Sequence, residues 1–364
     1  MERPDPKILI VGAGPTGLTA AVEFARYGIA VRIIDRNDGP TRLSKAVGVS
    51  AHSLDLLEVS GVAAGLLAEG VKVRRAHVWS GGRELGQIAF SVLRHRFDFL
   101  LSLPQSETET IMAGVLDASG VGVERQTTFV GLEQDSDGVR VSLDGPRGRE
   151  SARFDTVYGA DGAHSAVRDA IGLDFAGYEH ERLWSIADIE MAGWSADPTG
   201  AHLFFHRGGD VGFIIPVGGI RFRAFSNTAD ALAHIPGASR LARVLLTDTF
   251  HIPVRQAATY QQGHVYIGGD AAHVHSPLGA RGMNLGIEDA ASFVRRFVAG
   301  ELDDYTAERH PVGKRWIALS ERALSVAQAD GMITAGLRNL AVRIVGNIPP
   351  LQRPLLERMA GLRE

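Results

Sequence analysis

The chain has 364 residues, of which 45% are hydrophobic and 22% charged, the proportions of an ordinary globular protein that buries a large core. Its formal net charge of −4, from 38 basic and 42 acidic residues, argues against nucleic-acid binding, which usually needs a basic surface. The absence of cysteine excludes disulfides, thiolate metal sites and every cysteine-based mechanism.

The amino-terminal segment enters a strand pattern at once and leaves no space for a signal peptide. No apolar run along the chain reaches the roughly 18 to 20 residues that a membrane span requires. We therefore expect a cytoplasmic protein without a membrane span.

Residues 7–36 predict the first unit of the fold. The apolar residues 8–11 suit a strand that is buried on both faces, and residues 31–34 form a second strand of the same kind. An alanine-rich helical pattern separates the two. The segment is therefore expected to form a strand, helix, strand unit.

After residue 40 the pattern alternates between helical spacing, strands and glycine turns, with no tandem repeat or low-complexity linker. Prolines late in the chain are expected to break its helices. The expected elements, in chain order, are helices within 41–75, a hairpin over 76–93, a helix over 105–116, strands over 121–143, a strand, turn and helix over 154–172, strands over 184–260, and helices after residue 284 that break at Pro311 and at Pro349 and Pro350.

Glycine turns near residues 12, 159 and 268 are separated by β-rich segments, which predicts one nucleotide-binding domain interrupted by a second sheet. The expected fold is α/β, a Rossmann-like domain interrupted by a β-sheet substrate domain and followed by a helical carboxy terminus. The predicted boundaries are 1–75, 98–178 and 261–310 for the nucleotide-binding domain, 76–97 and 179–260 for the substrate domain, and 311–364 for the helical segment.

The motif GAGPTG lies directly between the first strand and the first helix. Gly12 permits the tight turn, Gly14 lets a pyrophosphate approach the backbone, and Gly17 lets helix and strand pack closely. The phosphate then lies at the positive end of the helix dipole. Asp35 closes the second strand, where its carboxylate can accept hydrogen bonds from ribose hydroxyls. The motif therefore predicts dinucleotide binding.

The dinucleotide is expected to be FAD. NAD-dependent dehydrogenases share the first motif, but two further glycine motifs follow here, GADGAHSAVR and GGDAAHVHSPLGARGMN. No second GxGxxG exists for another dinucleotide. One tightly held dinucleotide with several contact segments favours FAD over a diffusing nicotinamide.

Taken together, these motifs resemble those of the single-component FAD-dependent aromatic hydroxylases, the family of para-hydroxybenzoate hydroxylase. The resemblance covers nearly the whole chain. It rests on GAGPTG with Asp35, on RLSKAVGVSAHSLDLLEVSGV (42–62), LSLPQSETE (101–109) and GADGAHSAVR (159–168), and on the GGDAAHVHSPLGARGMNLGIEDA segment, in the same order and spacing.

The resemblance implies roles for individual residues. In the cofactor's phosphate and ribityl region it places Arg42 near the FAD phosphates, Gln105 against the ribityl chain, Asp161 in a motif associated with both FAD and the nicotinamide cofactor, and Asp270 on the ribityl hydroxyls. At the flavin ring it places Pro277 near the reactive carbon and N5, and the backbone of Gly282, Met283 and Asn284 at the pyrimidine side.

The helix expected to begin near Asn284 also has a physical role at the ring. Reduced flavin carries negative charge near N1 and the C2 carbonyl, and a helix amino terminus stabilises an anion by roughly 0.3 to 2 kcal/mol. Gly279 and Gly282 allow the backbone to approach closely.

The activity implied by the resemblance is that of a monooxygenase. FAD reduced by NADPH or NADH reacts with O2 to give a flavin C4a-hydroperoxide, which hydroxylates a small aromatic substrate, phenolic or polycyclic. An FAD-dependent reductase or dehydrogenase, or a non-catalytic flavin-binding protein, remains an alternative, whereas disulfide oxidoreductases are excluded by the absence of cysteine. The chain is expected to be a monomer or a homodimer, and packing on its own body is the favoured interpretation of its leucine-rich carboxy-terminal segment.

No catalytic residue is assigned from the sequence. His206 and Arg207 are candidates for the substrate pocket, because they lie in the β-rich block where the family builds it. His273 and His275 are a poor metal site, since two histidines at i and i+2 lack a third ligand at suitable spacing, so no metal is expected.

Overall fold

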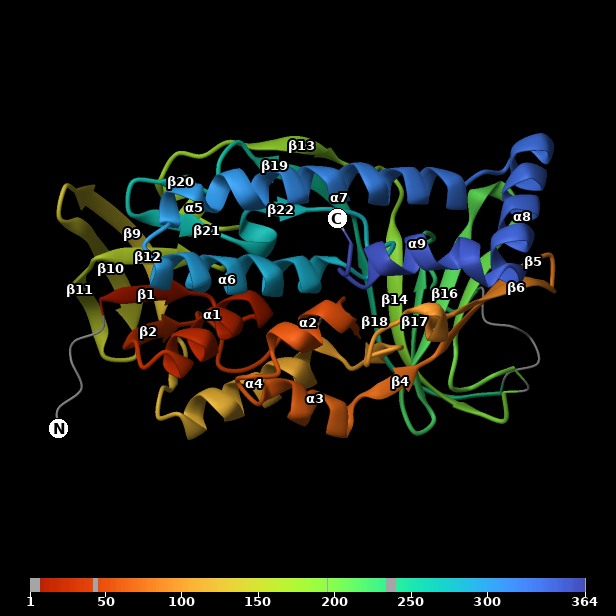
Figure 1. The fold of residues 1–364 in the computed structure, drawn as a ribbon, viewed down its shortest axis with the longest axis horizontal. Helices are drawn as coiled ribbons and strands as arrows, with labels where there is room; N and C mark the ends of the chain where they lie inside the picture. Colours follow the sequence, from red (N-terminus) through yellow and green to blue (C-terminus); the bar gives the residue numbers. More distant parts are fainter. Residues whose placement is uncertain (1–6, 42–44, 195, 234–239, 364) are drawn as a thin grey trace.

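The computed structural model describes residues 7–363 apart from 42–44, 195 and 234–239. The nucleotide-binding elements lie at one end of an elongated molecule and a large, mostly antiparallel sheet lies at the other (Figure 1). Helix α7 runs along much of the length between them.

The first strand, helix and strand form as expected and begin a central sheet. Strand β1 pairs in parallel with β2 on one side, Ile8 opposite Val31, and with β12 on the other, Ile8 opposite Thr156. All four residues of β1 are buried, which explains their continuous apolar pattern. The sheet order is β20 (Gln261–Gln262), β21 (Val265–Ile267), β12 (Thr156–Gly159), β1 (Ile8–Val11), β2 (Val31–Ile34) and β8 (Val123–Glu124), with α1 (Pro15–Arg26) between β1 and β2.

Three small sheets surround the central one. An antiparallel meander contributes Phe129, Val139 and Phe154 to the same hydrophobic core. The three sheets are β9 (Thr128–Asp135), β10 (Gly138–Gly145) and β11 (Gly148–Phe154); β3 (Gly48–Val49), β7 (Leu100–Ser102) and β4 (Val71–Val73); and β13 (Phe175–Glu179), β19 (Pro253–Ala257) and β22 (His273–Val274).

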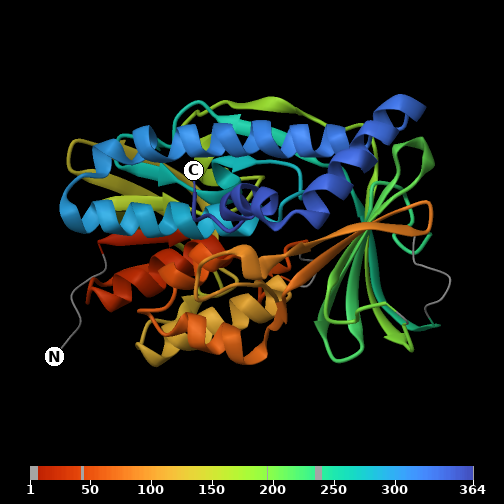
Figure 2. The same ribbon diagram turned by 45° about the vertical axis from the view of Figure 1, so that its right-hand side comes forward.

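The expected hairpin joins the strands after residue 184 in one seven-stranded sheet, which Figure 2 shows beside the nucleotide-binding elements. The hairpin turns at Gly81 and Gly82, whose φ angles are +58° and +75°. The domain boundaries that were predicted around this sheet stay a prediction. The sheet order is β18 (Arg240–Phe250), β14 (Trp184–Ala192), β17 (Arg221–Ser226), β16 (Val211–Gly218), β15 (Ala201–Phe205), β5 (Arg75–Ser80) and β6 (Arg83–Ala89).

Helices cover the sheets, and α1 packs against α4 and α6. None of the helices in the described ranges combines the length and apolar character needed to cross a membrane. The α-helices after α1 are α2 (Ala51–Leu56), α3 (Val62–Glu69), α4 (Gln105–Ala118), α5 (Ala166–Ala170), α6 (Gly282–Ala299), α7 (Tyr305–Ala327), α8 (Met332–Asn347) and α9 (Pro349–Met359), and short 3₁₀ turns include η2 (Arg207–Gly209) and η3 (Gly269–Ala271).

The expected break at Pro311 is wrong, because α7 continues through this residue. A proline inside a helix removes one backbone hydrogen bond and disfavours the helical conformation of the preceding residue. Tyr305, Val312 and Trp316 of α7 are buried on either side of the proline, so tertiary packing outweighs the local cost. The break at Pro349 is confirmed, since α8 ends at Asn347 and α9 begins at Pro349.

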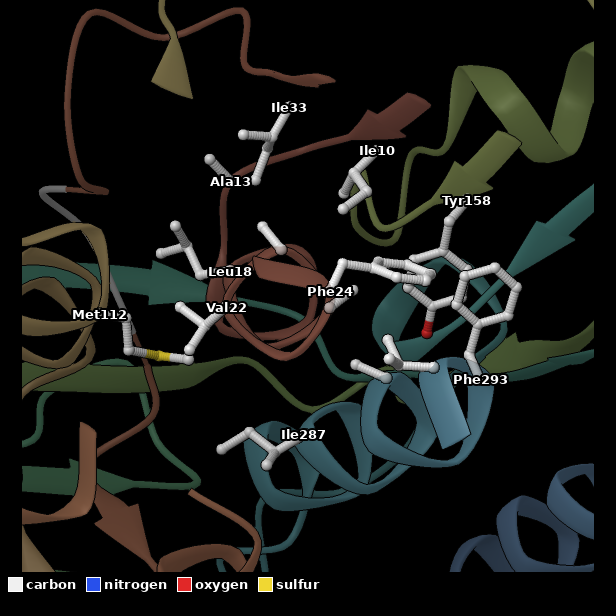
Figure 3. Close-up of a cluster of buried hydrophobic side chains, with 14 of the residues drawn as sticks. Ile10, Ala13, Leu18, Val22, Phe24, Ile33, Met112, Tyr158, Ile287 and Phe293 are labelled. Carbon is white, nitrogen blue, oxygen red and sulfur yellow. The ribbon is translucent and has the colours of Figure 1, made fainter. Parts of the chain in front are cut away.

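Phe293 of α6 lies in the hydrophobic core next to Tyr158 (Figure 3). Its ring stacks on Tyr158 of β12, with centroids 4.2 Å apart, and meets Phe24 of α1 edge to face at 5.9 Å. Such pairs add to the hydrophobic gain of burial. One side chain therefore links three elements that carry the nucleotide-binding motifs.

We expect Phe293→Ala to lower the free energy of unfolding by about 3–5 kcal/mol, the usual cost of emptying an aromatic site in a packed core. Urea denaturation of the purified protein measures this. Val298→Ala removes an exposed side chain from the same helix and is the control, with an expected change within about 0.5 kcal/mol. A similar, small loss for both variants would contradict this account of the core.

Candidate functional site

A cavity of about 220 Å³ lies where the carboxyl ends of β1, β2 and β12 meet. The chain leaves β1 toward β2 on one side, while β12 pairs on the other, so this is a switch point at which α/β sheets bind ligands. Five residues that the sequence singled out line this cavity, although they come from four separate segments: Gly12, Gly14, Asp35, Gln105 and Asp161.

The three glycines of the first motif have different surroundings. A Cβ on Gly12 would lie 2.3 Å from the carbonyl oxygen of Ala160, and one on Gly17 would lie 1.9 Å from that of Gly12. At Gly14 the nearest atom to an added Cβ is Glu109 Oε1, 4.0 Å away. Gly12 and Gly17 are therefore required by packing within the protein, whereas Gly14 borders open space at the amino terminus of α1.

The Asp35 carboxylate is held at the end of β2 by backbone groups. Its Oδ2 accepts a hydrogen bond of 2.7 Å from the N–H of Ala13, and its Oδ1 accepts one of 2.8 Å from the N–H of Asn37. A carboxylate offers about four lone-pair sites, so two donors leave capacity for a ligand's hydroxyls. Asp35 is therefore oriented toward the cavity and still able to accept.

Glu109 is a cavity residue that the sequence reasoning missed. It is buried, with Oε1 accepting from Gln105 Nε2 at 2.8 Å and Oε2 accepting from the N–H of Thr41 at 2.8 Å. Burial raises the pKa of this carboxyl above its usual value. The available signal was its spacing of four residues from Gln105 on a predicted helix, which places both on one face.

Asp161 lines the cavity and also binds the first turn of the short helix α5, whose N-cap is Ser165. Its Oδ1 accepts from Ser165 Oγ at 2.5 Å and its Oδ2 accepts from the N–H of Val167 at 3.2 Å. Burial raises the pKa of the Asp161 carboxyl, and these hydrogen bonds oppose that shift. The residue therefore has a structural role in this turn as well as a position at the cavity.

Lys45 and Asp270 act on each other electrostatically, and Lys45 lies where the nucleotide-binding elements approach the seven-stranded sheet. Lys45 is exposed, and its Nζ lies 4.0 Å from the ring centroid of Phe250 on β18. Surrounding protein lowers the pKa of Lys45, while the charges of Asp270 and Asp248 oppose that shift. Asp270 is itself exposed, yet the protein around its carboxyl raises its pKa.

Arg42, predicted near the phosphates, lies outside the described residues.

The turn over 276–282 delivers the chain to the amino terminus of α6. Pro277 is exposed on this turn, and Ala280 has a φ of +53°, an uncommon conformation for a residue with a side chain. The first helical hydrogen bond runs from the N–H of Leu285 to the carbonyl of Arg281, so the N–H groups of Gly282 and Met283 precede it. Backbone donors are therefore concentrated at this helix end.

Asn284 clamps this turn to the segment before α2. Its Oδ1 accepts from the N–H of Ser50 and from Ser53 Oγ, both at 2.8 Å. Its Nδ2 donates to the carbonyls of Gly48 at 2.9 Å and Ala280 at 2.6 Å. The side chain is thus fully used within the protein, which leaves only the backbone of Asn284 for a ligand.

A buried ion cluster joins the η3 turn to α6 and α7. Asp289 Oδ2 accepts from His273 Nε2 at 2.7 Å and from the N–H of Gly269 at 3.0 Å, and its Oδ1 accepts from Arg309 Nε at 2.7 Å. The charges of Arg309 and His273 lower the pKa of Asp289 to about 2, against the opposing effect of burial. The sequence reasoning missed this carboxylate because it lies 16 residues after His273, inside α6.

His275 is neutral at physiological pH, because burial lowers its pKa to about 4. Its Nδ1 donates to the carbonyl of Ser276 at 2.8 Å. Within the described ranges, no group of three or more histidine, cysteine or acidic side chains is arranged to hold a metal ion.

The two faces of the seven-stranded sheet differ in what they contact. The inner face packs Ile186 and Phe225 against Val47 of the nucleotide-binding side. Phe204 lies in a separate cluster on the outer face, and His206 stacks beside it with ring centroids 6.3 Å apart. Arg207, on η2, is exposed. A pocket role for His206 and Arg207 stays a prediction that their placement does not support.

The inner face also carries a charged pair. Arg223 donates to Asp188 through Nε at 2.6 Å and Nη2 at 2.8 Å, and its Nη1 donates to the carbonyl of Ala46 at 3.3 Å. This bidentate pair ties the sheet to the segment that contains Lys45.

Comparison with known proteins places these features in context. A family model for the FAD binding domain matches residues 5–239 and 228–320. The chain is 31% identical over 401 residues to 12-dehydrotetracycline 5-monooxygenase/anhydrotetracycline 6-monooxygenase of Streptomyces rimosus subsp. rimosus, covering 98% of this chain and 76% of that protein. It is 31% identical over 340 residues to pentachlorophenol 4-monooxygenase of Sphingobium chlorophenolicum, covering 85% and 63%. The crystal structure of p-nitrophenol 4-monooxygenase from Pseudomonas putida DLL-E4 shares the fold, with a TM-score of 0.89, 21% identity and coverage of 98% and 99%.

We expect Gly14→Val to weaken FAD binding at least about tenfold, because its side chain would enter the cavity rather than the protein. The backbone at Gly14 is extended, so valine fits there and the thermal stability of the flavin-free protein should not change. Flavin titration and thermal unfolding measure the two effects. Gly114→Val, on an exposed part of α4, is the control. Unchanged flavin affinity in Gly14→Val would contradict the position of the ligand.

We expect Asp289→Asn to cost about 3 kcal/mol of stability at pH 7, because Arg309 would lose the nearer of its two buried counter-charges and keep only Glu288, 3.3 Å away. The pKa of Asp289 is lowered in the folded state, so its contribution is present above about pH 4 and is lost as the pH falls toward 2. The difference between variant and wild type should therefore shrink over that range in urea denaturation. Asp303→Asn, which changes an exposed carboxylate, should show little effect. A pH-independent difference would contradict the ionised state of Asp289.

Proposed function

Because the chain belongs to the FAD binding domain family and is an FAD-dependent monooxygenase of the aromatic-hydroxylase type, we propose that it hydroxylates a phenolic compound, with one ring or several fused rings. In this proposal NADPH or NADH is the reductant and O2 the oxidant. The observation that carries it is the cavity lined by Gly14, Asp35 and Gln105. The 276–282 turn approaches Gly48 through Ala280, and the neighbouring Val47 packs with the apolar inner face of the sheet.

The cavity fits the adenosine and phosphate half of FAD. Gly14 borders open space at a helix amino terminus, which suits a pyrophosphate, and Asp35 retains acceptor capacity for ribose hydroxyls. We assign the ribityl region to Gln105, which lines the cavity, and to Asp270, beside Lys45. When bound, FAD supplies the two-electron redox chemistry and the reaction with O2.

The amino terminus of α6 fits the pyrimidine side of the flavin ring. Gly282, Met283 and Asn284 precede or begin the helical hydrogen-bonding pattern, so their N–H groups can stabilise negative charge on the ring. The Asn284 clamp keeps this helix end in place without using its backbone donors. Pro277 lies on the exposed side of the same turn, and we place it at the reacting edge of the ring.

We place the aromatic substrate beside the inner face of the sheet, near the segment that contains Val47. Phe213 and Phe225 lie with ring centroids 6.0 Å apart on neighbouring strands, and Ile186 belongs to the same cluster. Aromatic rings bind well between such side chains, which also exclude water from the reaction. The relatives named for tetracycline and pentachlorophenol support a phenolic substrate. We assign no side chain as a catalytic base.

Purified protein is expected to carry FAD and to oxidise NADPH or NADH faster when a suitable phenol is present. Turnover under ¹⁸O2 should place one labelled oxygen atom in the product, measured by mass spectrometry across a panel of one-ring and fused-ring phenols. Gly14→Val should lose the phenol-stimulated oxidation of the nicotinamide and the incorporation of oxygen, and Gly114→Val should retain both.

Other results would replace this proposal. Substrate-linked oxidation of the nicotinamide that continues without O2 would identify a reductase or dehydrogenase. Bound FAD with no nicotinamide oxidation under any condition would identify a flavin-binding protein without turnover.

A further inference from the structure

A carboxyl group lies inside the nucleotide cavity, at the place where the phosphates of a dinucleotide are expected. Glu109 of α4 is 3% exposed and lines the cavity together with Gly14. A Cβ on Gly14 would have Glu109 Oε1 as its nearest neighbour, 4.0 Å away. The space at the amino terminus of α1 that suits a pyrophosphate is therefore bordered by an acidic side chain. A carboxylate and a phosphate at such close range repel each other strongly where water is excluded.

The hydrogen-bond partners of Glu109 do not neutralise its charge. Oε1 accepts from the side-chain amide of Gln105 and Oε2 accepts from the backbone N–H of Thr41, both at 2.8 Å, and both donors are uncharged. Each carboxyl oxygen has a second lone pair, so the group can bind a proton without losing either hydrogen bond. The same orientation of the side chain therefore suits its ionised and its neutral form.

The charges around Glu109 favour its neutral form. Burial raises the pKa of the carboxyl and the negative charge of Asp35 adds to that shift, while the two hydrogen bonds and the positive charge of Arg125 oppose it. Among the described residues, the other charged or titratable side chains that line the cavity are Asp35, Arg36, Arg125, Asp161 and His164. The dianionic pyrophosphate of FAD would add further negative charge beside Glu109, which disfavours its ionised form again.

We propose that Glu109 takes up a proton when FAD binds, and that its neutral carboxyl then donates an O–H hydrogen bond to the pyrophosphate. The proton comes from the solvent and returns to it when FAD leaves. FAD and the proton therefore bind cooperatively, since each favours the state that binds the other. The proposal rests on the placement of FAD given under the proposed function, and it is independent of the substrate.

Asp161 is another carboxyl at this cavity whose pKa is raised by burial, but its surroundings differ. The Ser165 hydroxyl and the backbone N–H groups of Asp161, Ala166 and Val167 all stabilise its ionised form. Glu109 has two donors and the opposing charge of Asp35. Glu109 is therefore the carboxyl that we expect to take up the proton.

Equilibrium dialysis of the FAD-loaded protein from about pH 5 to about pH 9 tests the proposal, because buried glutamates titrate in this range. We expect the dissociation constant for FAD to be lowest at the acidic end. It should rise by up to about tenfold for each pH unit above the pKa of Glu109 in the flavin-free protein, and level off above the pKa in the complex. A dissociation constant that stays the same across the range would overturn the proposal.

Glu109→Gln separates this carboxyl from the other groups, because it is neutral and has the same shape. Its amide keeps both contacts if Gln105 turns its own amide oxygen toward it. We expect its dissociation constant for FAD to vary less than about threefold over the pH range and to lie below that of the wild type at the alkaline end. Thermal unfolding checks that the variant is folded.

Glu107→Gln is the matched control, since Glu107 belongs to the same helix but pairs with Arg221 at 3.5 Å instead of lining the cavity. It should keep the pH dependence of the wild type. The same pH dependence in Glu109→Gln would overturn the proposal, as would its loss in Asp161→Asn alone. Folded Glu109→Gln that binds no FAD at any pH would also overturn it, because a neutral side chain should suffice.

Infrared difference spectroscopy measures the protonation state in the loaded protein without any activity assay. The FAD-loaded wild type should show the carbonyl stretching band of a neutral carboxylic acid that shifts in D2O and is missing from Glu109→Gln. Identical spectra for the two proteins in this region would contradict a neutral Glu109. An error in the placement of FAD is distinguishable, because Gly14→Val would then bind FAD as well as the wild type does.

Discussion

The nucleotide cavity depends on two contacts that leave no space for a side chain. Gly17 of α1 meets the carbonyl of Gly12, and Gly12 meets the carbonyl of Ala160 after β12. These contacts bring β1, α1 and the glycine turn after β12 so close that the carboxyl ends of three parallel strands open into one cavity. The positions of Asp35 and Asp161 then follow from the strand order. Gly14, between the two packed glycines, borders space that the protein does not fill, and there a ligand can reach the helix end.

The buried charges around Asp289 extend this arrangement to the other half of the proposed site. The carboxylate binds the backbone of Gly269, the ring of His273 and the guanidinium of Arg309, and so it joins η3, β22, α6 and α7. Burying charge is costly unless the geometry satisfies each group, so such a cluster tolerates few alternative arrangements. The Asn284 clamp acts in the same way on the next turn along the chain. Together they position the start of α6 relative to the cavity.

The seven-stranded sheet contacts the nucleotide-binding elements through one of its two faces. Its inner face meets the nucleotide-binding elements through Val47, Ile186 and Phe225, and the Arg223–Asp188 pair holds the sheet to the segment before β3. Substrate and flavin are therefore expected at the junction of the two halves. Helix α8 lies beside this sheet, at the end of the molecule away from β1 (Figure 1).

What the sequence determined by itself is local. The strand, helix, strand unit, the hairpin at Gly81 and Gly82 and the glycine motif follow from side-chain period and from backbone freedom within a few neighbouring residues. Only the tertiary structure decided that Glu109 faces the cavity, that Asp289 meets His273, that His206 lies on the outer face and that α7 continues through Pro311. These outcomes depend on contacts between residues far apart along the chain. Their energies are set by how whole helices and sheets pack, which no local pattern records.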